Sequence, residues 1–225
     1  MITQRGNILF LILLAVVLFA ALSYAVTQGM RGGGKDAGPE KFKTLASQIL
    51  QNVSLMENTM MRAMTVNGVP GYGFDLSGIA SSAAANATCT QSSCKLFASQ
   101  GGGVPDLVIP DWARTSGAAN SYPTFRMIRI KNIGTNGEEL VATYRYLNLS
   151  LCEALNSVLG NTDIDLTNYN QGWGGYGNYS GTLTDFPALS AGQLGNVITA
   201  LAGKRAFCFP HSAEGYTFVN VLLAQ

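Results

Sequence analysis

Four cysteines, Cys89, Cys94, Cys152 and Cys208, are the side chains of this chain best suited to form covalent bonds. Four cysteines allow three pairings. The spacing favours Cys89–Cys94, which closes the short segment TCTQSSC, and Cys152–Cys208, which ties a mid-domain helix to a late strand. In the chain-entropy model the longer loop contributes about 4 kcal/mol. Four buried thiols are the alternative, and a structural metal is disfavoured because two short CxxC pairs are missing. Disulfides would place the domain outside the cytoplasm.

Hydrolytic chemistry has one candidate base in this chain. A Ser-His-acid site would have to use His211, the only histidine, with Glu214 nearby and an orienting acid chosen from Asp111, Asp163, Asp165 and Asp185. The sequence has no GxSxG turn and no Gly-Lys-Ser/Thr loop for phosphate. We interpret His211 as a turn histidine and expect neither an enzyme nor a cofactor. Asp163 and Asp165 could offer oxygen ligands to calcium, but the EF-hand spacing is missing, so no metal site is predicted.

A loop rich in glycine and aromatic residues is the most unusual local composition. It carries Tyr169, Trp173, Tyr176 and Tyr179 between glycines, which exclude a stable helix. Interleaved aromatic rings give a large contact area at low side-chain entropy cost. The loop is a candidate contact with a neighbouring copy or a sugar. The alternative, which we favour, is that its aromatic side chains fold back on their own domain.

The element that must position this chemistry begins with an apolar stretch from Ile8 to Val26. It has nineteen residues without a charge, thirteen of them Leu, Ile, Val or Phe. As a helix it would be about 28 Å long, close to the roughly 30 Å hydrocarbon thickness of a bilayer. We therefore expect it to span a membrane. It could be a secretory signal cleaved after Ala25, a permanent anchor, or a helix that later packs against copies of itself.

The residues on both sides of the apolar stretch favour the third possibility. Arg5 and Gly6 precede it directly, and an amphipathic helix leading into a β-rich region follows it. This pattern, which covers about the first 65 residues, resembles the type IV pilin and pseudopilin family. The resemblance implies cleavage after Gly6 by a prepilin peptidase and N-methylation of Asn7. It also implies storage in the inner membrane, followed by packing of the helix in the core of an extracellular filament.

The chain differs from the family pattern at two positions. Members usually begin the mature chain with Phe or Met and carry Glu at its fifth residue, whereas Asn7 and Leu11 stand here. Because Leu11 offers no charge for a neighbouring amine, the register of a filament must come from helix packing. The residues expected to pack are Ile8, Leu11, Ala15, Leu18, Ala21 and Leu22.

Composition agrees with a filament subunit at a cell surface. The chain has 14 basic and 13 acidic residues, and charged residues make up 12%, about half the usual share. It therefore has no electrostatic footprint for nucleic acid. The expected partners are copies of this chain and the membrane. The alternatives are a membrane-anchored or secreted module that binds a glycan or envelope component, and a minor pseudopilin of a secretion system.

The predicted organisation is α+β with one globular domain. It consists of a leader at 1–6, a transmembrane or filament-core helix at 7–30, a glycine-rich joint at 31–38 and a pilin-like domain at 39–225. Three consecutive glycines, Gly32 to Gly34, each cost a helix roughly 1 kcal/mol, so the joint is expected to interrupt it. A second helix is expected to begin at Pro39. Its apolar face, which recurs at helical spacing, comprises Phe42, Leu45, Ala46, Ile49, Val53, Met56, Met60 and Met64.

The remainder reads as an antiparallel sheet with helical inserts. A hairpin is predicted over 123–146 with its turn at Asn136-Gly137. A short helix capped by Asn148 or Ser150 should end at Gly160. Another helix is expected over 190–202, and a closing hairpin over 204–225.

Overall fold

A computed structural model describes residues 7–71, 73–78, 85–115, 123–128, 130, 132–133, 139–167, 199–211 and 215–224. The chain divides into two compact units, Met1–Lys41 and Phe42–Gln225. This boundary falls three residues beyond the predicted joint at 31–38.

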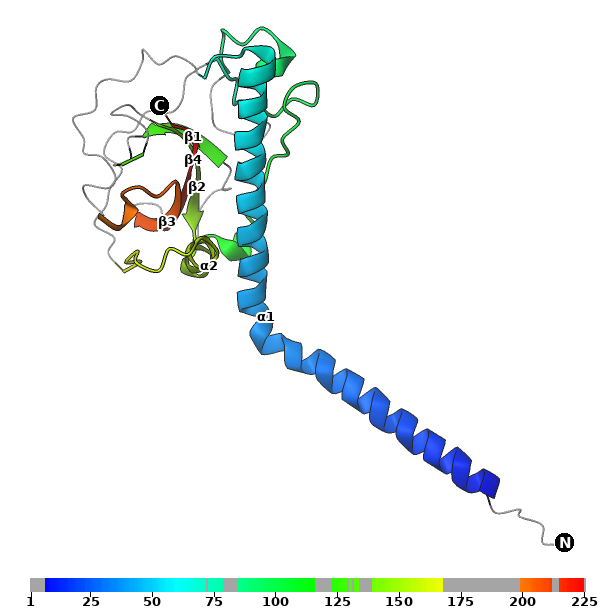
Figure 1. The fold of residues 1–225 in the computed structure, drawn as a ribbon. Coiled ribbons are helices and arrows are strands. Elements are labelled where there is room, and N and C mark those ends of the chain that lie inside the picture. Colours follow the sequence, from blue (N-terminus) through cyan, green and yellow to red (C-terminus); the bar gives the residue numbers. More distant parts are fainter. Residues whose placement is uncertain are drawn as a thin grey trace, which may run out of the picture. The chain divides into compact units, whose positions relative to one another are not determined.

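The described part of the chain has an α+β fold, which confirms the predicted class (Figure 1). Its four strands form one antiparallel sheet in the order β1-β2-β4-β3. The helices and strands are α1 (Asn7–Asn67), η1 (Ser92–Cys94), η2 (Asp111–Ala113), β1 (Pro123–Ile128), β2 (Glu139–Leu147), α2 (Leu149–Leu159), η4 (Thr199–Leu201), β3 (Ala206–His211) and β4 (Gly215–Leu223).

The glycine-rich joint was expected to interrupt the helix, and this prediction is wrong. Helix α1 is continuous from Asn7 to Asn67 and contains Pro39, which was expected to begin a new helix. The intrinsic helix propensity of a residue predicts its conformation only weakly. Helical residues on both sides of 31–38 supply backbone hydrogen-bond partners, so a helix can propagate through the glycines. The cost assigned to three glycines was real but too small to decide the outcome.

The second half of α1 is amphipathic as predicted. Leu45, Ile49, Val53 and Met56 are among its buried residues, whereas the side chains expected on the opposite face are exposed, namely Lys43, Ser47, Gln51, Asn58 and Arg62. The helix ends at Asn67, and the next residue, Gly68, has a φ of 64°. A residue without a Cβ adopts this left-handed conformation at little cost, so the predicted Asn-Gly stop is confirmed.

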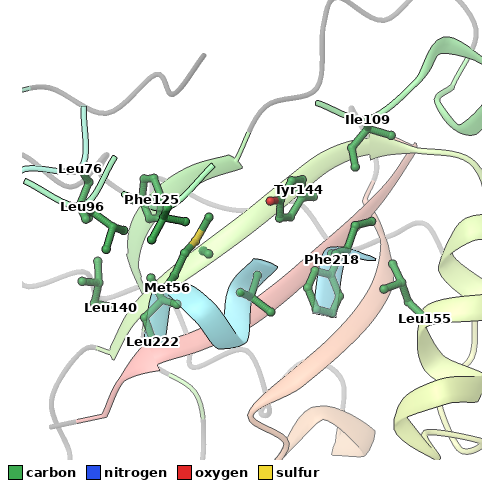
Figure 2. Packing of buried hydrophobic residues seen from close by; sticks show 14 of the residues in the cluster. Met56, Leu76, Leu96, Ile109, Phe125, Leu140, Tyr144, Leu155, Phe218 and Leu222 are labelled. Carbon is green, nitrogen blue, oxygen red and sulfur yellow. The ribbon is translucent and has the colours of Figure 1, made fainter. Parts of the chain in front are cut away.

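One hydrophobic core lies between α1 and the sheet. Figure 2 shows Met56 of α1 directed toward Phe125 of β1 and Leu140 of β2. A buried polar pair fixes the register of this contact, because the Tyr144 hydroxyl donates to Asn52 Oδ1 at 2.9 Å. The Asn52 amide in turn donates to the Pro105 carbonyl at 2.9 Å. Every polar atom buried here without a partner would cost about 1–3 kcal/mol, so this network specifies one position of α1.

A second core covers the other face of the sheet. It contains Val141, Phe207 and Val219 from three strands, together with Ile164 and Leu201 from outside the sheet. Successive side chains along a strand point to opposite faces of the sheet, so they alternate between the two cores. This explains why β2 and β4 are buried along most of their length although both are antiparallel strands.

The two predicted hairpins and the short helix between them are confirmed. Strand β1 pairs with β2 and β3 pairs with β4, both antiparallel. The Asn148 side chain accepts a hydrogen bond from the Leu151 amide at 3.0 Å, and Gly160 ends α2 with a φ of 72°. The predicted turn at Asn136-Gly137 lies outside the described residues. Of the helix expected at 190–202, the described residues contain only the short η4.

Helix α2 closes the outer edge of strand β3. Asn156 Nδ2 donates to the Cys208 carbonyl at 2.8 Å, and the Cys208 amide donates to Asn156 Oδ1 at 2.9 Å. Asn161 donates to the Ala206 carbonyl at 2.9 Å. Pro210 has no amide proton to offer at this edge. Several of the backbone groups that could recruit another strand are thus occupied or missing along β3.

Candidate assembly surfaces

Residues 10–19 of the N-terminal unit expose large apolar side chains on all sides of the helix. Those described are Phe10, Ile12, Leu13, Leu14, Val16, Val17, Leu18 and Phe19, whose exposed fractions run from 46% to 75%. Consecutive helical residues are about 100° apart, so eight positions within ten residues leave no polar side. We call residues 10–24 the apolar run. A helix that is apolar on all sides is normally covered by protein or lipid.

The structure describes part of the predicted packing set. Ala15, Leu18 and Ala21 are exposed residues of α1. Ile8, Leu11 and Leu22 belong to the same helix, but their side chains lie outside the described residues, as does the expected cleavage residue Gly6. Asn7, the expected first residue after cleavage, is the first residue of α1.

Among the helices that can be assessed from the described residues, none offers an apolar length sufficient for a membrane crossing.

Sequence reasoning missed a second apolar surface, on the globular unit. The Trp112 side chain is 48% exposed and Leu149 is 42% exposed. The Trp112 ring meets the ring of Phe42 edge-on, with centroids 5.3 Å apart and planes inclined by 64°. We call these three residues the Trp112 patch. The available signal was a tryptophan directly after Pro110-Asp111, because Pro and Asp are typical of turns, which lie at the surface.

Backbone contacts hold the Trp112 patch together. Asn148 Nδ2 donates to the Trp112 carbonyl at 3.0 Å, and the Asn148 amide donates to the Ala113 carbonyl at 3.0 Å. The residue that caps α2 thereby ties the turn that carries Trp112 to the start of the helix, whose first residue is Leu149. Arg114 forms an ion pair with Asp111 at the same turn.

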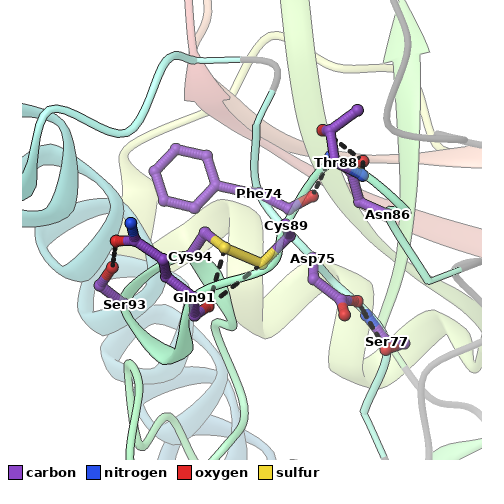
Figure 3. The surroundings of a disulfide bond; sticks show 9 residues. All are labelled: Phe74, Asp75, Ser77, Asn86, Thr88, Cys89, Gln91, Ser93 and Cys94. Atoms are coloured by element: carbon purple, nitrogen blue, oxygen red, sulfur yellow. Dashed lines mark hydrogen bonds between the residues drawn. A yellow bond between two sulfur atoms is a disulfide. The ribbon is translucent and has the colours of Figure 1, made fainter.

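Two disulfides stabilise the globular unit, in the pairing that the sequence favoured. Cys152 of α2 is bonded to Cys208 of β3, at a sequence separation of 56. Cys89 is bonded to Cys94 at a separation of 5, within the loop shown in Figure 3. Asn86 supports this loop, because its side chain donates to the Phe74 carbonyl at 3.1 Å and accepts from the Thr88 amide at 2.9 Å.

The interpretation of His211 as a turn residue is wrong. It is the last residue of β3, pairs with Gly215 and is 5% exposed. Burial, together with the positive charges of Arg145 and Arg126, lowers the pKa of His211 to about 4. The imidazole is therefore neutral at pH 7. Strand register, which the sequence window around a single histidine does not reveal, decided this burial.

The aspartates considered as calcium ligands have other partners. The Asp163 carboxylate lies 3.1 Å from Lys204 Nζ, and this hydrogen bond lowers the pKa of Asp163. Asp165 accepts hydrogen bonds from the side chain and the amide of Thr167, and these lower its pKa. In the described segments, no three His, Cys, Asp or Glu side chains gather as a set of metal ligands.

The predicted contact loop with Tyr169, Trp173, Tyr176 and Tyr179 lies outside the described residues. Comparison with known proteins gives no match to a family model, to a curated protein or to a solved structure.

Proposed function

We propose that this chain is a structural subunit of an extracellular, type IV pilus-like filament. In this proposal its N-terminal helix holds the precursor in the inner membrane and then packs with the same helix of sister copies. The observation that carries the proposal is the apolar run, which presents large aliphatic and aromatic side chains on all sides.

The energetics of the apolar run support a partner. Full burial of a Leu, Val, Ile or Phe side chain contributes about 1.5–3 kcal/mol. Eight such side chains are 46–75% exposed, so covering them would contribute roughly 10 kcal/mol. This is comparable to the entire stability of an ordinary domain. A helix of this composition is therefore expected to be covered in its working state.

Small residues within the run favour sister helices as the cover. Ala15, Ala20, Ala21 and Ser23 are exposed positions of α1. Lipid tails are as apolar as the side chains of these helices, so the hydrophobic effect does not favour moving a helix from the bilayer into a bundle. The helices must instead associate through close packing. Small side chains permit that approach. The filament register would then depend on shape, since Leu11 stands where the family pattern has Glu.

A small-to-large substitution separates packing from membrane anchoring. Ala21→Phe keeps the helix apolar and able to insert, but it blocks close approach at a small position. Leu18→Phe, at a position that is already large, is the matched control. We expect at least a tenfold loss of filaments from sheared surface fractions for Ala21→Phe, seen by electron microscopy, and little change for Leu18→Phe. Finding the unsubstituted protein only as dispersed membrane-bound monomers would refute the proposal.

The native N-terminus distinguishes the alternatives. Mass spectrometry should find a chain that begins at Asn7 if the protein is processed as a pilin. A chain that begins at Val26 would instead indicate a secreted binding module, and an intact Met1 would indicate either an anchor or an unprocessed subunit.

A further inference from the structure

Polar side chains lie on the face of the sheet that carries the second core. Arg126 of β1 pairs directly with Val141, which belongs to that core. Thr217 of β4 pairs directly with Phe209, another of its members. Because directly paired residues of an antiparallel sheet project from the same face, Arg126 and Thr217 lie on this face as well. His211 follows Phe209 by two positions along β3, which keeps it on the same side.

A β-bulge places a second arginine opposite Thr217. Between two successive pairs of β2 and β4, two residues of β2, Arg145 and Tyr146, stand opposite the single Thr217 of β4. Tyr146 has a φ of 59°, a left-handed conformation that is unfavourable for a residue with a Cβ. The Arg145 guanidinium carbon lies 5.2 Å from the centre of the Tyr146 ring, so the ring attracts this arginine. Bulges and unfavourable backbone conformations are both concentrated near functional sites.

The two arginines and the histidine lie within electrostatic reach of one another. Burial, followed by the charge of Arg145, lowers the pKa of Arg126. Burial, followed by the charges of both arginines, lowers the pKa of His211. The two like charges repel each other on this partly buried surface, and an anion between them would weaken that repulsion. His211 is neutral at pH 7, so its ring offers an N–H donor without adding a third charge.

The Thr217 hydroxyl is an independent indication of a ligand. Thr217 is fully buried, and its Oγ1 makes no hydrogen bond in the part of the chain that the structure describes. A buried polar group without a partner destabilises a fold, and the few that occur commonly mark a bound water or ion. Strand β4, which carries Thr217, lies between β2 with Arg145 and β3 with His211. A ligand held between those two side chains would therefore lie over the hydroxyl.

We infer that this face of the sheet binds a tetrahedral oxyanion, phosphate or sulfate, through Arg126, Arg145, His211 and Thr217, which we call the arginine site. Guanidinium groups match the geometry of oxyanions and remain charged at any physiological pH. The two arginines together carry two positive charges, which suits a dianion better than a carboxylate. The four side chains come from four different strands, so an ion with acceptor oxygens in several directions can meet more of them. This inference goes beyond the filament proposal and does not depend on it.

The only histidine of the chain provides a site-specific reporter of binding. No other histidine contributes ring signals that overlap with those of His211. Nuclear magnetic resonance of isotope-labelled histidine follows this ring in the full chain, in mild detergent and phosphate-free buffer at pH 7, while sodium phosphate is added. We expect a saturable shift, and sodium sulfate should produce one as well. Sodium chloride at the same ionic strength should produce none. A response to phosphate no larger than the response to chloride would overturn the inference.

Substitutions separate binding at the arginine site from a general effect of charge. Thr217→Val keeps the shape of the side chain and removes only a hydroxyl without a partner, so the fold should be preserved. We expect it to weaken phosphate binding at least threefold, and Arg145→Gln to weaken it at least tenfold. The matched control, Arg62→Gln, removes an exposed arginine of α1 and should change nothing. Unchanged affinity in Thr217→Val, or an equal loss in Arg62→Gln, would overturn the inference.

Two further titrations identify the source of the oxyanion. Glycerol phosphate that binds as tightly as inorganic phosphate would assign the site to a phosphate ester of a larger molecule. Glycerol phosphate that binds at least tenfold more weakly would assign it to the free ion. Acetate should bind at least tenfold more weakly than phosphate, and equal binding would overturn the preference for a tetrahedral ion. Filament yield enters none of these measurements, so their failure would leave the filament proposal standing.

Discussion

Replacing Asn156 by Leu should destabilise the globular unit without disturbing its covalent framework. Asn156 is 4% exposed, and its side-chain amide makes two hydrogen bonds to the backbone of Cys208. Leu has the same number of side-chain heavy atoms, branched at the same carbon, and a good helix propensity, but it can neither donate nor accept a hydrogen bond. The disulfide from Cys152 to Cys208 remains, and the strand edge stays tethered to the helix.

The magnitude follows from the two groups left without a partner. Cys208 is fully buried, so water cannot readily replace the lost hydrogen bonds of its amide and carbonyl. Each unsatisfied buried group costs about 1–3 kcal/mol. Burial of the leucine side chain in the core offsets part of this loss of stability. We expect a net loss of about 3 kcal/mol in the free energy of unfolding.

Urea unfolding of the full chain in mild detergent, followed by far-ultraviolet circular dichroism, measures this loss. For a domain of this size the slope is about 2 kcal/mol per molar urea, so the midpoint should fall by about 1.5 M. The control is Asn161→Leu, which removes a single hydrogen bond, to Ala206, at a half-buried site. It should cost about 1 kcal/mol. Equal losses for the two variants, or a midpoint shift below about 0.3 M for Asn156→Leu, would refute the reasoning.

Two further predictions concern covalent and acid stability. Removing the Cys152–Cys208 bond, with its separation of 56, by double substitution to Ala should cost about 4 kcal/mol. Removing Cys89–Cys94, with its separation of 5, should cost about 2 kcal/mol; the same urea assay tests both, and a larger loss for the short loop would contradict the chain-entropy argument. The folded-state pKa of His211 is lowered to about 4 from 6.5. Between these values the unfolded state binds the proton more strongly, so stability is present above pH 6.5 and decreases as the pH falls toward 4. His211→Gln should reduce the loss between pH 7 and pH 4.5 by up to about 2.5 kcal/mol, and an unchanged pH profile would show that the buried imidazole is not its cause.

Local sequence determined the elements whose forces act over a few residues. Asn148 caps α2 because its side chain reaches an amide three residues away. Gly68 follows the last residue of α1 in a conformation that suits glycine. The buried face of α1 could be predicted because the 3.6-residue period places residues three and four apart on one side. The strand pairs were predicted for a similar reason, since short connections join neighbouring antiparallel strands.

Tertiary structure decided the features that join distant residues. The hydrogen bond between Tyr144 and Asn52 joins residues 92 positions apart in the sequence, and the hydrogen bond between Asn156 and Cys208 joins residues 52 positions apart. The exposure of Trp112 and the burial of His211 likewise depend on which surfaces meet. Helix α1 is continuous through its glycines, although each glycine destabilises a helix by about 1 kcal/mol relative to alanine. Helix propensity therefore did not decide this feature either. Local preferences are additive and short in range, whereas burial is a property of the whole packed chain, so the sequence determined the elements and the packing determined the surfaces.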